Sequence, residues 1–208
     1  MTRDVLLVHG LWMKGAVMLP LARRLARAGF RTHTLSYASL GGGLDDHVEK
    51  LRRAVEALGA PHVCIVAHSM GGIVTLHYLA RARMPTARVV LLGSPVSGCL
   101  AGRTLAAHGL WRTVLGRSAE LWETWHGLML PDHAEVGAIA GTGRVGIGRF
   151  FVDLPEPNDG AVMVSETRMP GLAAHIVLPV SHSAMLLSPE VAQETAHFLR
   201  SGRFRRAA

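Results

Sequence analysis

The chain has 208 residues, of which 49% are hydrophobic and 18% are charged, so it can fill one domain and is too apolar to be disordered. Its 22 basic and 15 acidic residues give a net charge of +7. The arginines are scattered and no nucleic-acid motif accompanies them, which favours a solvated basic face over a nucleic-acid site and leaves transient contact with a lipid surface as an alternative. No apolar run approaches the roughly 20 residues of a membrane-spanning helix.

The N-terminus and the cysteines indicate the compartment. A strand is predicted to begin at Val5, which leaves no room for a signal peptide, so we expect a cytoplasmic protein. Two cysteines do not make a disulfide framework, and Cys64 lies inside an apolar run. Cys64 and Cys99 are therefore expected to be free thiols.

Short apolar runs alternate with helical patterns from residue 5 to residue 92. Strands are predicted at 5–8, 31–35, 63–66 and 88–92. Apolar residues that recur every three or four positions predict helices between them, over 17–25, 48–58 and 70–83. This alternation is typical of an α/β fold, with a mostly parallel sheet covered by helices on both faces.

The alternation breaks between Pro95 and Pro131. The large apolar residues of this segment suit short helices with one apolar face, which predicts either ordinary core packing or a cap over an active site. They are Trp111, Leu115, Trp122, Trp125 and Met129. As a cap, the segment would place the three tryptophans against a substrate. We treat 1–208 as one domain in which 95–131 is a cap or lid insertion.

Regular structure is predicted again after this segment. Strands are expected at 135–140 and 175–180, with a Gly- and Pro-rich loop between them. A closing helix is expected from Pro189 to Arg200, with Val191 and Phe198 facing inward and Gly202 at its end.

Ser69 is the leading candidate for a nucleophile. It lies where an apolar strand ends and a helix begins, in the sequence Ala67-His-Ser69-Met-Gly71-Gly72. A nucleophile in such a turn needs small residues two positions before and after it, because strand and helix pass close together. Ala67 departs from the usual glycine by one methyl group. The alternative is a serine that only caps the following helix.

A second loop could supply oxyanion donors. The predicted strand at 5–8 runs into His9 and Gly10, and glycine lets this backbone approach a substrate. One donor would be the N–H of Met70, and the other that of Leu11, with Trp12 as the less favoured choice. His9 is interpreted as a residue that fixes the loop.

These segments together resemble the lipase and esterase branch of the α/β-hydrolase superfamily. The resemblance covers almost the whole chain, in order. It implies a catalytic triad in the order serine, acid, histidine, with no cofactor.

The histidine and the acid of that triad are expected on loops after late strands. His182 follows the predicted last strand, whereas His175 begins that strand and His197 lies in the closing helix. Asp159 resembles the acid of the N-D-G-x-V segment in related lipases. Asp153 is its rival, and an Asx turn before Gly160 is the structural alternative for Asp159.

Two other motifs are weaker. Gly141, Gly143 and Gly146 fit the dinucleotide pattern G-x-G-x-x-G, with Glu166 in place of the ribose-binding acid, but no helix is predicted to open on them. The segment His133-Ala-Glu135 lacks the P-C-x-x-C of a zinc deaminase. We expect no cofactor and no metal.

The expected function is hydrolysis of a small-molecule or lipid carboxylic ester through an acyl-enzyme. A thioesterase on the same triad and a non-catalytic binding protein on this scaffold are the alternatives.

Overall fold

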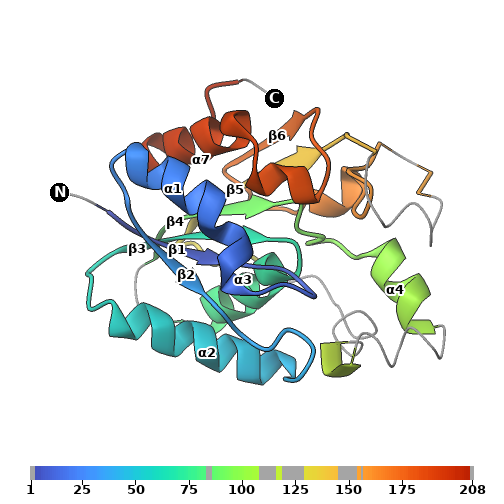
Figure 1. Ribbon diagram of the computed structural model, residues 1–208, viewed down its shortest axis with the longest axis horizontal. Helices are drawn as coiled ribbons and strands as arrows, with labels where there is room; N and C mark the ends of the chain where they lie inside the picture. The colour runs from blue at the N-terminus through green and yellow to red at the C-terminus, as the bar shows by residue number, and fades with distance from the viewer. Residues whose placement is uncertain are drawn as a thin grey trace.

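A computed structural model of the protein is shown in Figure 1. It describes residues 3–82, 86–107, 116–118, 129–144, 154–155 and 157–206. These residues form a parallel sheet in the strand order β2-β1-β3-β4-β5-β6. The strands are β1 (Asp4–Val8), β2 (Arg31–Leu35), β3 (Val63–His68), β4 (Thr86–Leu92), β5 (Glu135–Gly141) and β6 (Ala174–Leu178).

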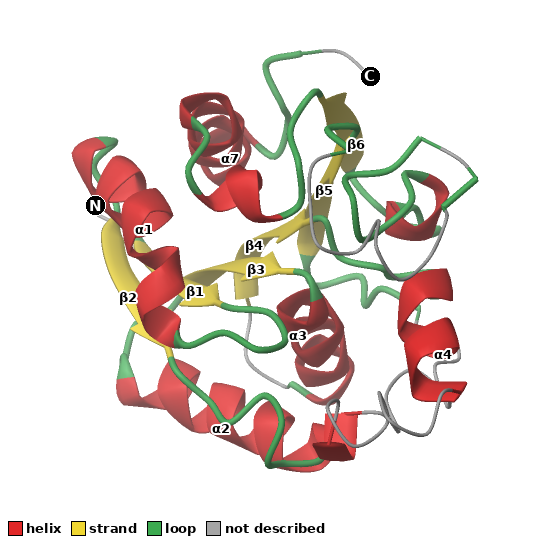
Figure 2. Ribbon diagram, turned by 45° about the vertical axis from the view of Figure 1, so that its right-hand side comes forward, coloured by secondary structure: helices red, strands yellow, loops and turns green. Residues whose placement is uncertain are grey.

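Helices cover both faces of this sheet (Figures 1 and 2). On one face lie α1 (Leu19–Arg27), which follows the 3-10 turn η1 (Gly15–Met18), and α7 (Pro189–Ser201). On the other face lie α2 (Leu44–Ala57) and α3 (Met70–Arg81). Shorter elements are α4 (Leu100–Ala107), η2 (Gly116–Ser118), η4 (Ser165–Thr167) and η5 (Ser183–Leu186). The predicted α/β fold is confirmed.

The central strands are apolar along their whole length because both of their faces are buried. In β3, Ile65 and Ala67 pack into the core under α2 and α3, whereas Cys64 and Val66 pack into the core under α1 and α7. Successive side chains of a strand point to opposite faces, so a strand between two helical layers has no solvated side.

The ends of α7 follow from local chemistry. The Ser188 hydroxyl accepts the N–H of Val191 at 3.2 Å, and Pro189 occupies the first turn, where its missing N–H costs nothing. Gly202 ends the helix with φ of 75°, a conformation that favours glycine. Val191 and Phe198 are fully buried, as predicted.

Two details of the predicted elements were wrong. The last strand ends at Leu178 and not at Val180, because Pro179 has no N–H to donate to the sheet. Val17 was expected to begin a helical pattern, but it lies exposed in η1, and the neighbouring Met18 is buried instead. A 3-10 turn has three residues per turn, which shifts the buried position by one.

The strand β2 forms one edge of the sheet. Its Arg31 and His33 both contact Asp4 of β1, with N···O distances of 3.1 and 2.8 Å. Asp4 is thus buried beneath charged and polar side chains that line the edge.

The segment 95–131 is described only in part. It includes α4, which Figure 2 shows outside the two helical layers. Met129, which was assigned to an apolar face, is 89% exposed. Trp111, Trp122 and Trp125 lie outside the described residues, so the cap remains a prediction. None of the helices in the described part of the chain is both long and apolar enough to cross a membrane.

Candidate active site

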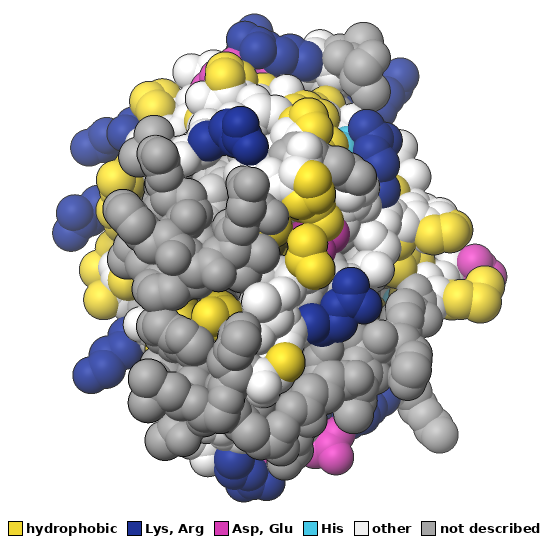
Figure 3. Space-filling view, turned by 90° about the vertical axis from the view of Figure 1, so that its right-hand side faces the viewer, with side chains coloured by type: hydrophobic (Ala, Val, Ile, Leu, Met, Phe, Trp, Pro, Cys, Tyr) yellow, Lys and Arg dark blue, Asp and Glu magenta, His cyan; other side chains and the backbone are white. Residues whose placement is uncertain are grey.

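The loops that carry the candidate residues meet at one edge of the sheet. Because all strands are parallel, their carboxyl ends lie together, on the side toward which the arrows point in Figure 1. Figure 3 looks onto this side, where the Lys and Arg side chains are spread over the surface among hydrophobic ones. Ser69 directly follows β3, and His182 follows β6 by four residues.

Ser69 has a backbone conformation that L-residues rarely adopt. Its φ of 55° and ψ of −128° contrast with the helical backbone that starts at Met70. The turn is held by two hydrogen bonds: the N–H of Ser69 donates to the carbonyl of Leu92 at 2.9 Å, and its own carbonyl accepts the N–H of Gly72 at 2.9 Å. Strain of this kind at a strand-to-helix turn is typical of an exposed nucleophile.

Two glycines let other backbone segments approach this turn. A Cβ atom on Gly10 would lie 2.9 Å from the Cβ of Ser69, so the loop after β1 passes directly beside the serine. A Cβ on Gly71 would lie 2.5 Å from the carbonyl oxygen of His9. Ala67 is fully buried in the core, so its methyl group is accommodated where glycine is usual.

Replacing Gly71 with alanine should destabilise the protein. The new methyl group would press on the backbone of His9, which cannot rotate away, so α3 must shift from β1 at a cost of about 1–3 kcal/mol. Gly41→Ala is the matched control, because its Cβ would meet only the Ala38 side chain at 3.6 Å. Urea unfolding of both variants measures the difference, and equal stabilities would contradict the close approach.

The predicted oxyanion donors, the N–H groups of Met70 and Leu11, belong to the two segments that meet at Ser69. Met70 is the first residue of α3, so its N–H has no acceptor within the helix. Within the described residues the N–H of Leu11 donates to no protein acceptor. The N–H of Met70 thus lies at the positive end of α3, and Leu11 directly follows Gly10, which approaches Ser69.

His9 holds the loop that contains Leu11. Its Nδ1–H donates to the carbonyl of Gly10 at 2.8 Å, and its Nε2 accepts the N–H of Tyr37 at 3.3 Å. The Tyr37 hydroxyl donates to the carbonyl of His9 at 2.8 Å, and the two rings stack with centroids 4.4 Å apart. Burial lowers the pKa of His9, which favours the neutral ring that these contacts require.

His182 and Asp159 form a hydrogen-bonded pair in which Asp159 is buried and His182 is partly buried. The Nδ1–H of His182 donates to Oδ2 of Asp159 at 2.7 Å, and the Asp159 side chain is only 1% exposed. The other carboxylate oxygen accepts the N–H groups of Ala161 and Val162 at 3.0 and 2.8 Å. Asp159 thus makes the Asx-type turn and also orients the histidine. Its rival, Asp153, lies outside the described residues.

The loop after β4 passes close to this pair. Gly93 has φ of 53°, and a Cβ there would lie 2.8 Å from Oδ2 of Asp159 and 3.1 Å from Nδ1 of His182. A Cβ on Gly141, at the end of β5, would lie 2.8 Å from the Cβ of Asp159. Three strand ends therefore meet around one carboxylate.

Ser69 is linked to the pair through its neighbour in sequence. Among the described residues, no hydrogen bond joins the Ser69 hydroxyl to His182. Instead, the ring of His68 contacts the ring of His182 with centroids 4.6 Å apart, and its Nε2–H donates to the carbonyl of His182 at 3.0 Å. Catalytic hydrogen bonds are often long in a free enzyme and tighten with substrate.

Comparison with known proteins identifies the family. Residues 5–138 match the family model of the alpha/beta hydrolase fold. The chain belongs to the α/β-hydrolase family. No curated protein sequence matches the chain.

Solved structures resemble the hydrolase over nearly its whole length. The mature lipase BlEst2 of Bacillus licheniformis matches with a TM-score of 0.69 and 17% identity, over 98% of this chain and 93% of that one. A metagenomic carboxyl esterase, MGS0156, matches with a TM-score of 0.70 and 19% identity, over 95% of this chain and 75% of that one. Carboxylesterase CesB of Bacillus subtilis matches with a TM-score of 0.60 and 16% identity, over 97% of this chain and 84% of that one. At these identities the likeness establishes the fold.

His68 is a residue of the candidate site that the sequence did not single out. It is completely buried, and burial, followed by the nearby His182, lowers its pKa to about 3. A neutral His68 adds no second positive charge beside His182 when that ring is protonated. Its position directly before Ser69, at the carboxyl end of the buried strand β3, is the feature that could have identified it.

The buried histidines should make the protein less stable in acid. Below the ordinary pKa of 6.5 the unfolded chain gains a proton at His68 that the folded chain gains only near pH 3. The free energy of unfolding should therefore fall as the pH falls from 6.5, by about 1.4 kcal/mol per pH unit for one such group.

His68→Gln should reduce this slope, and His133→Gln, at an exposed turn, should leave it unchanged. Urea unfolding between pH 7 and pH 5 gives the slopes. A loss of stability that is the same at every pH does not change the slope, so the slopes of the variants can be compared directly. Identical slopes for His68→Gln and the wild-type protein would contradict the pKa shift.

Glu166 has a structural role. Its two oxygens accept the N–H groups of Met163 and Leu100, which ties the Asp159 loop to the first residue of α4. Burial raises its pKa. Gly143 donates its N–H to Val180 at 2.9 Å, and no helix begins at 141–144, so the described glycines of the dinucleotide pattern serve loop packing. The described residues contain no cluster of three or more metal-ligating side chains.

Proposed function

We propose that this hydrolase cleaves carboxylic esters, with Ser69 as nucleophile, His182 as general base and Asp159 as the acid that orients it. The observation that carries the proposal is one combination at one sheet edge: a strained Ser69 at a strand-to-helix turn, beside the hydrogen-bonded His182–Asp159 pair. The lipase and esterase names of similar structures agree with this chemistry.

The proposed reaction proceeds through an acyl-enzyme. Ser69 attacks the ester carbonyl while Nε2 of His182 takes the hydroxyl proton, and Asp159 stabilises the imidazolium through Nδ1–H. The N–H groups of Leu11 and Met70 bind the oxyanion of the tetrahedral intermediate. His182 gives its proton to the leaving alcohol. It then activates the water that releases the carboxylic acid and regenerates Ser69.

Labelling with a fluorophosphonate tests the nucleophile. Its phosphorus reacts with an activated serine, so the folded protein should carry one adduct, found on Ser69 by peptide mass spectrometry. Protein unfolded in urea is the control and should remain unlabelled, because an unactivated serine reacts slowly. Folded protein that carries no adduct on Ser69 would contradict the catalytic proposal and leave a binding protein on this scaffold.

The substrate is proposed to be an ester with a medium or long acyl chain. Trp12 follows the Gly10 loop and is 50% exposed, and its ring is proposed to contact the substrate. Trp111, Trp122 and Trp125 are proposed to add apolar surface from the cap. Rates on p-nitrophenyl esters of increasing chain length test this, and a steep preference for acetate would contradict it. Matched thioesters distinguish a thioesterase.

A further inference from the structure

A cavity lies between α1 and α7, the two helices that run side by side over one face of the sheet (Figures 1 and 2). Its volume is about 440 Å³, and none of the proposed catalytic residues lines it. Four arginines, which we call the groove arginines, surround it: Arg24, Arg27, Arg200 and Arg205. Ala192 and Ala196 leave the space between the helices open, and no carboxylate lines it.

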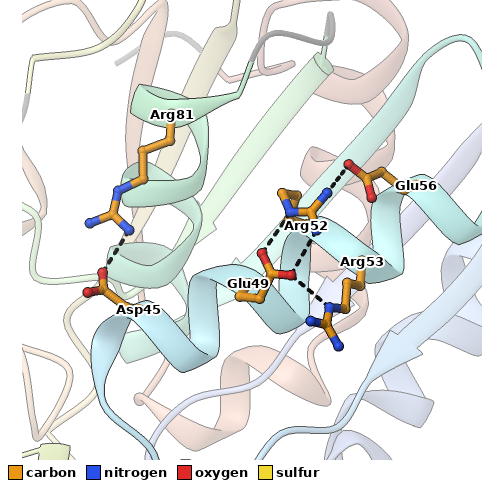
Figure 4. Close-up of polar contacts among 6 residues, drawn as sticks. All are labelled: Asp45, Glu49, Arg52, Arg53, Glu56 and Arg81. Carbon is orange, nitrogen blue, oxygen red and sulfur yellow. Dashed lines mark hydrogen bonds and ion pairs between the residues drawn. The ribbon is translucent and has the colours of Figure 1, made fainter.

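The groove arginines have no acidic partners within the described residues. The arginines around α2 differ. There Arg52 pairs with Glu49 and Glu56, and Arg53 pairs with Glu49 at 2.7 Å (Figure 4). Arg81 of α3 likewise pairs with Asp45. Local carboxylates thus neutralise the arginines around α2, whereas no described carboxylate pairs with the groove arginines.

The acidic residues of α7 are engaged elsewhere. Glu190 pairs with Arg206 at 2.5 Å, and Glu194 accepts the backbone N–H of Arg205 at 2.7 Å. Four guanidinium groups therefore face one hollow without compensation. Their mutual repulsion is relieved when an anion enters.

Two of the guanidinium groups are fixed in place by backbone carbonyls. Arg24 donates from Nη2 to the carbonyl of Leu187 at 3.1 Å, while its Nε is buried and has no partner. Arg200 donates from Nη2 to the carbonyl of Ala28, and its Cζ lies 5.2 Å from the centre of the Phe30 ring. Each group keeps further N–H donors free. Fixing the donors beforehand lowers the entropic cost of binding a ligand.

We propose that this groove binds a phosphoryl group of a small soluble molecule. A phosphoryl group carries up to two charges on three strong acceptor oxygens, and guanidinium groups bind such oxygens in pairs. The volume suits a small ligand, and a concave site between two helices selects a discrete molecule over a flat anionic surface. The proposal does not depend on ester hydrolysis.

Isothermal titration calorimetry on the full chain tests the site, with pyrophosphate and glycerol 1-phosphate as probes at constant ionic strength. We expect saturable binding of one equivalent. Arg27→Gln/Arg205→Gln should weaken it about ten-fold or more. Both side chains are exposed and make no described hydrogen bond, so the variant should fold. Arg52→Gln/Arg53→Gln removes the same charge from paired positions and should leave the affinity within about two-fold.

Three outcomes would overturn the proposal. In the first, neither probe binds at millimolar concentration. In the second, both double variants weaken binding equally, which means that only the net charge of the protein matters. In the third, the protein binds vesicles of phosphatidylglycerol but neither soluble probe. Arg24→Gln is a further variant, because it removes the buried Nε. Its thermal unfolding is measured with and without pyrophosphate, and stabilisation equal to that of the wild-type protein would also overturn the site.

Discussion

Replacing Ser69 with glycine is expected to abolish ester hydrolysis and to make the fold more stable. Loss of the nucleophile should lower kcat by about 10⁴-fold or more. Glycine adopts φ of 55° and ψ of −128° without the steric cost that a Cβ imposes, which is about 1–3 kcal/mol for strained residues. After the greater chain entropy of glycine is subtracted, a gain of about 1 kcal/mol in the free energy of unfolding remains. Urea unfolding measures it.

Ser69→Ala is the matched control for this effect. It also removes the hydroxyl, so activity should fall to the same level, but it retains the Cβ and should bring no comparable gain in stability. The two variants thus separate catalysis from backbone strain. An alanine variant that keeps more than about a hundredth of the wild-type kcat would contradict the assignment of the nucleophile.

Replacing Asp159 with asparagine should lower kcat by about 10⁴-fold with little change in the fold. The asparagine carbonyl oxygen would accept the N–H groups of Ala161 and Val162, as Oδ1 does now. Its NH₂ group would then face Nδ1 of His182 in place of Oδ2. The histidine would be held with its proton on Nε2, where it cannot accept the proton of Ser69.

Two further variants make this result specific. Asp132→Asn removes one carboxylate from an exposed turn and should leave kcat unchanged. Asp153→Asn tests the rival acid and should also retain activity. If Asp153→Asn lost activity and Asp159→Asn kept it, the acid would be misassigned. Circular dichroism of each variant checks the fold.

Much of the fold was predictable because both faces of the sheet are buried. Apolar runs such as 63–66 can be recognised without knowledge of their neighbours, and every predicted strand is present. The strand order was not predictable, because it depends on contacts between segments distant in sequence. Local errors arose where a feature other than hydrophobic periodicity set the end of an element or its buried face. Pro179 ends β6, and a 3-10 turn exposes Val17.

The candidate site was predictable only where the residues adjacent in sequence identify the functional residue. Ser69 could be placed from the strand before it and the glycines after it. The contacts of His68 with His182 could not, because they join residues 114 positions apart in the sequence. The closeness of Gly93 to Asp159 likewise depends on the packing of β4 beside β5. The sequence also posed the Asx turn and a role beside the histidine as alternatives, whereas Asp159 uses one oxygen for the turn and the other for His182.

The two edges of the sheet differ in a way that affects how the protein behaves at high concentration. The edge strand β2 presents Arg31, which is 64% exposed, above the buried Asp4. A strand from a second molecule added there would bring its own charges against this arginine, and such edges resist sheet growth. The opposite edge strand, β6, carries no Lys, Arg, Asp or Glu, and its Val177 is 41% exposed. Aggregation through strand addition, where it occurs, should therefore begin at β6 and spare β2.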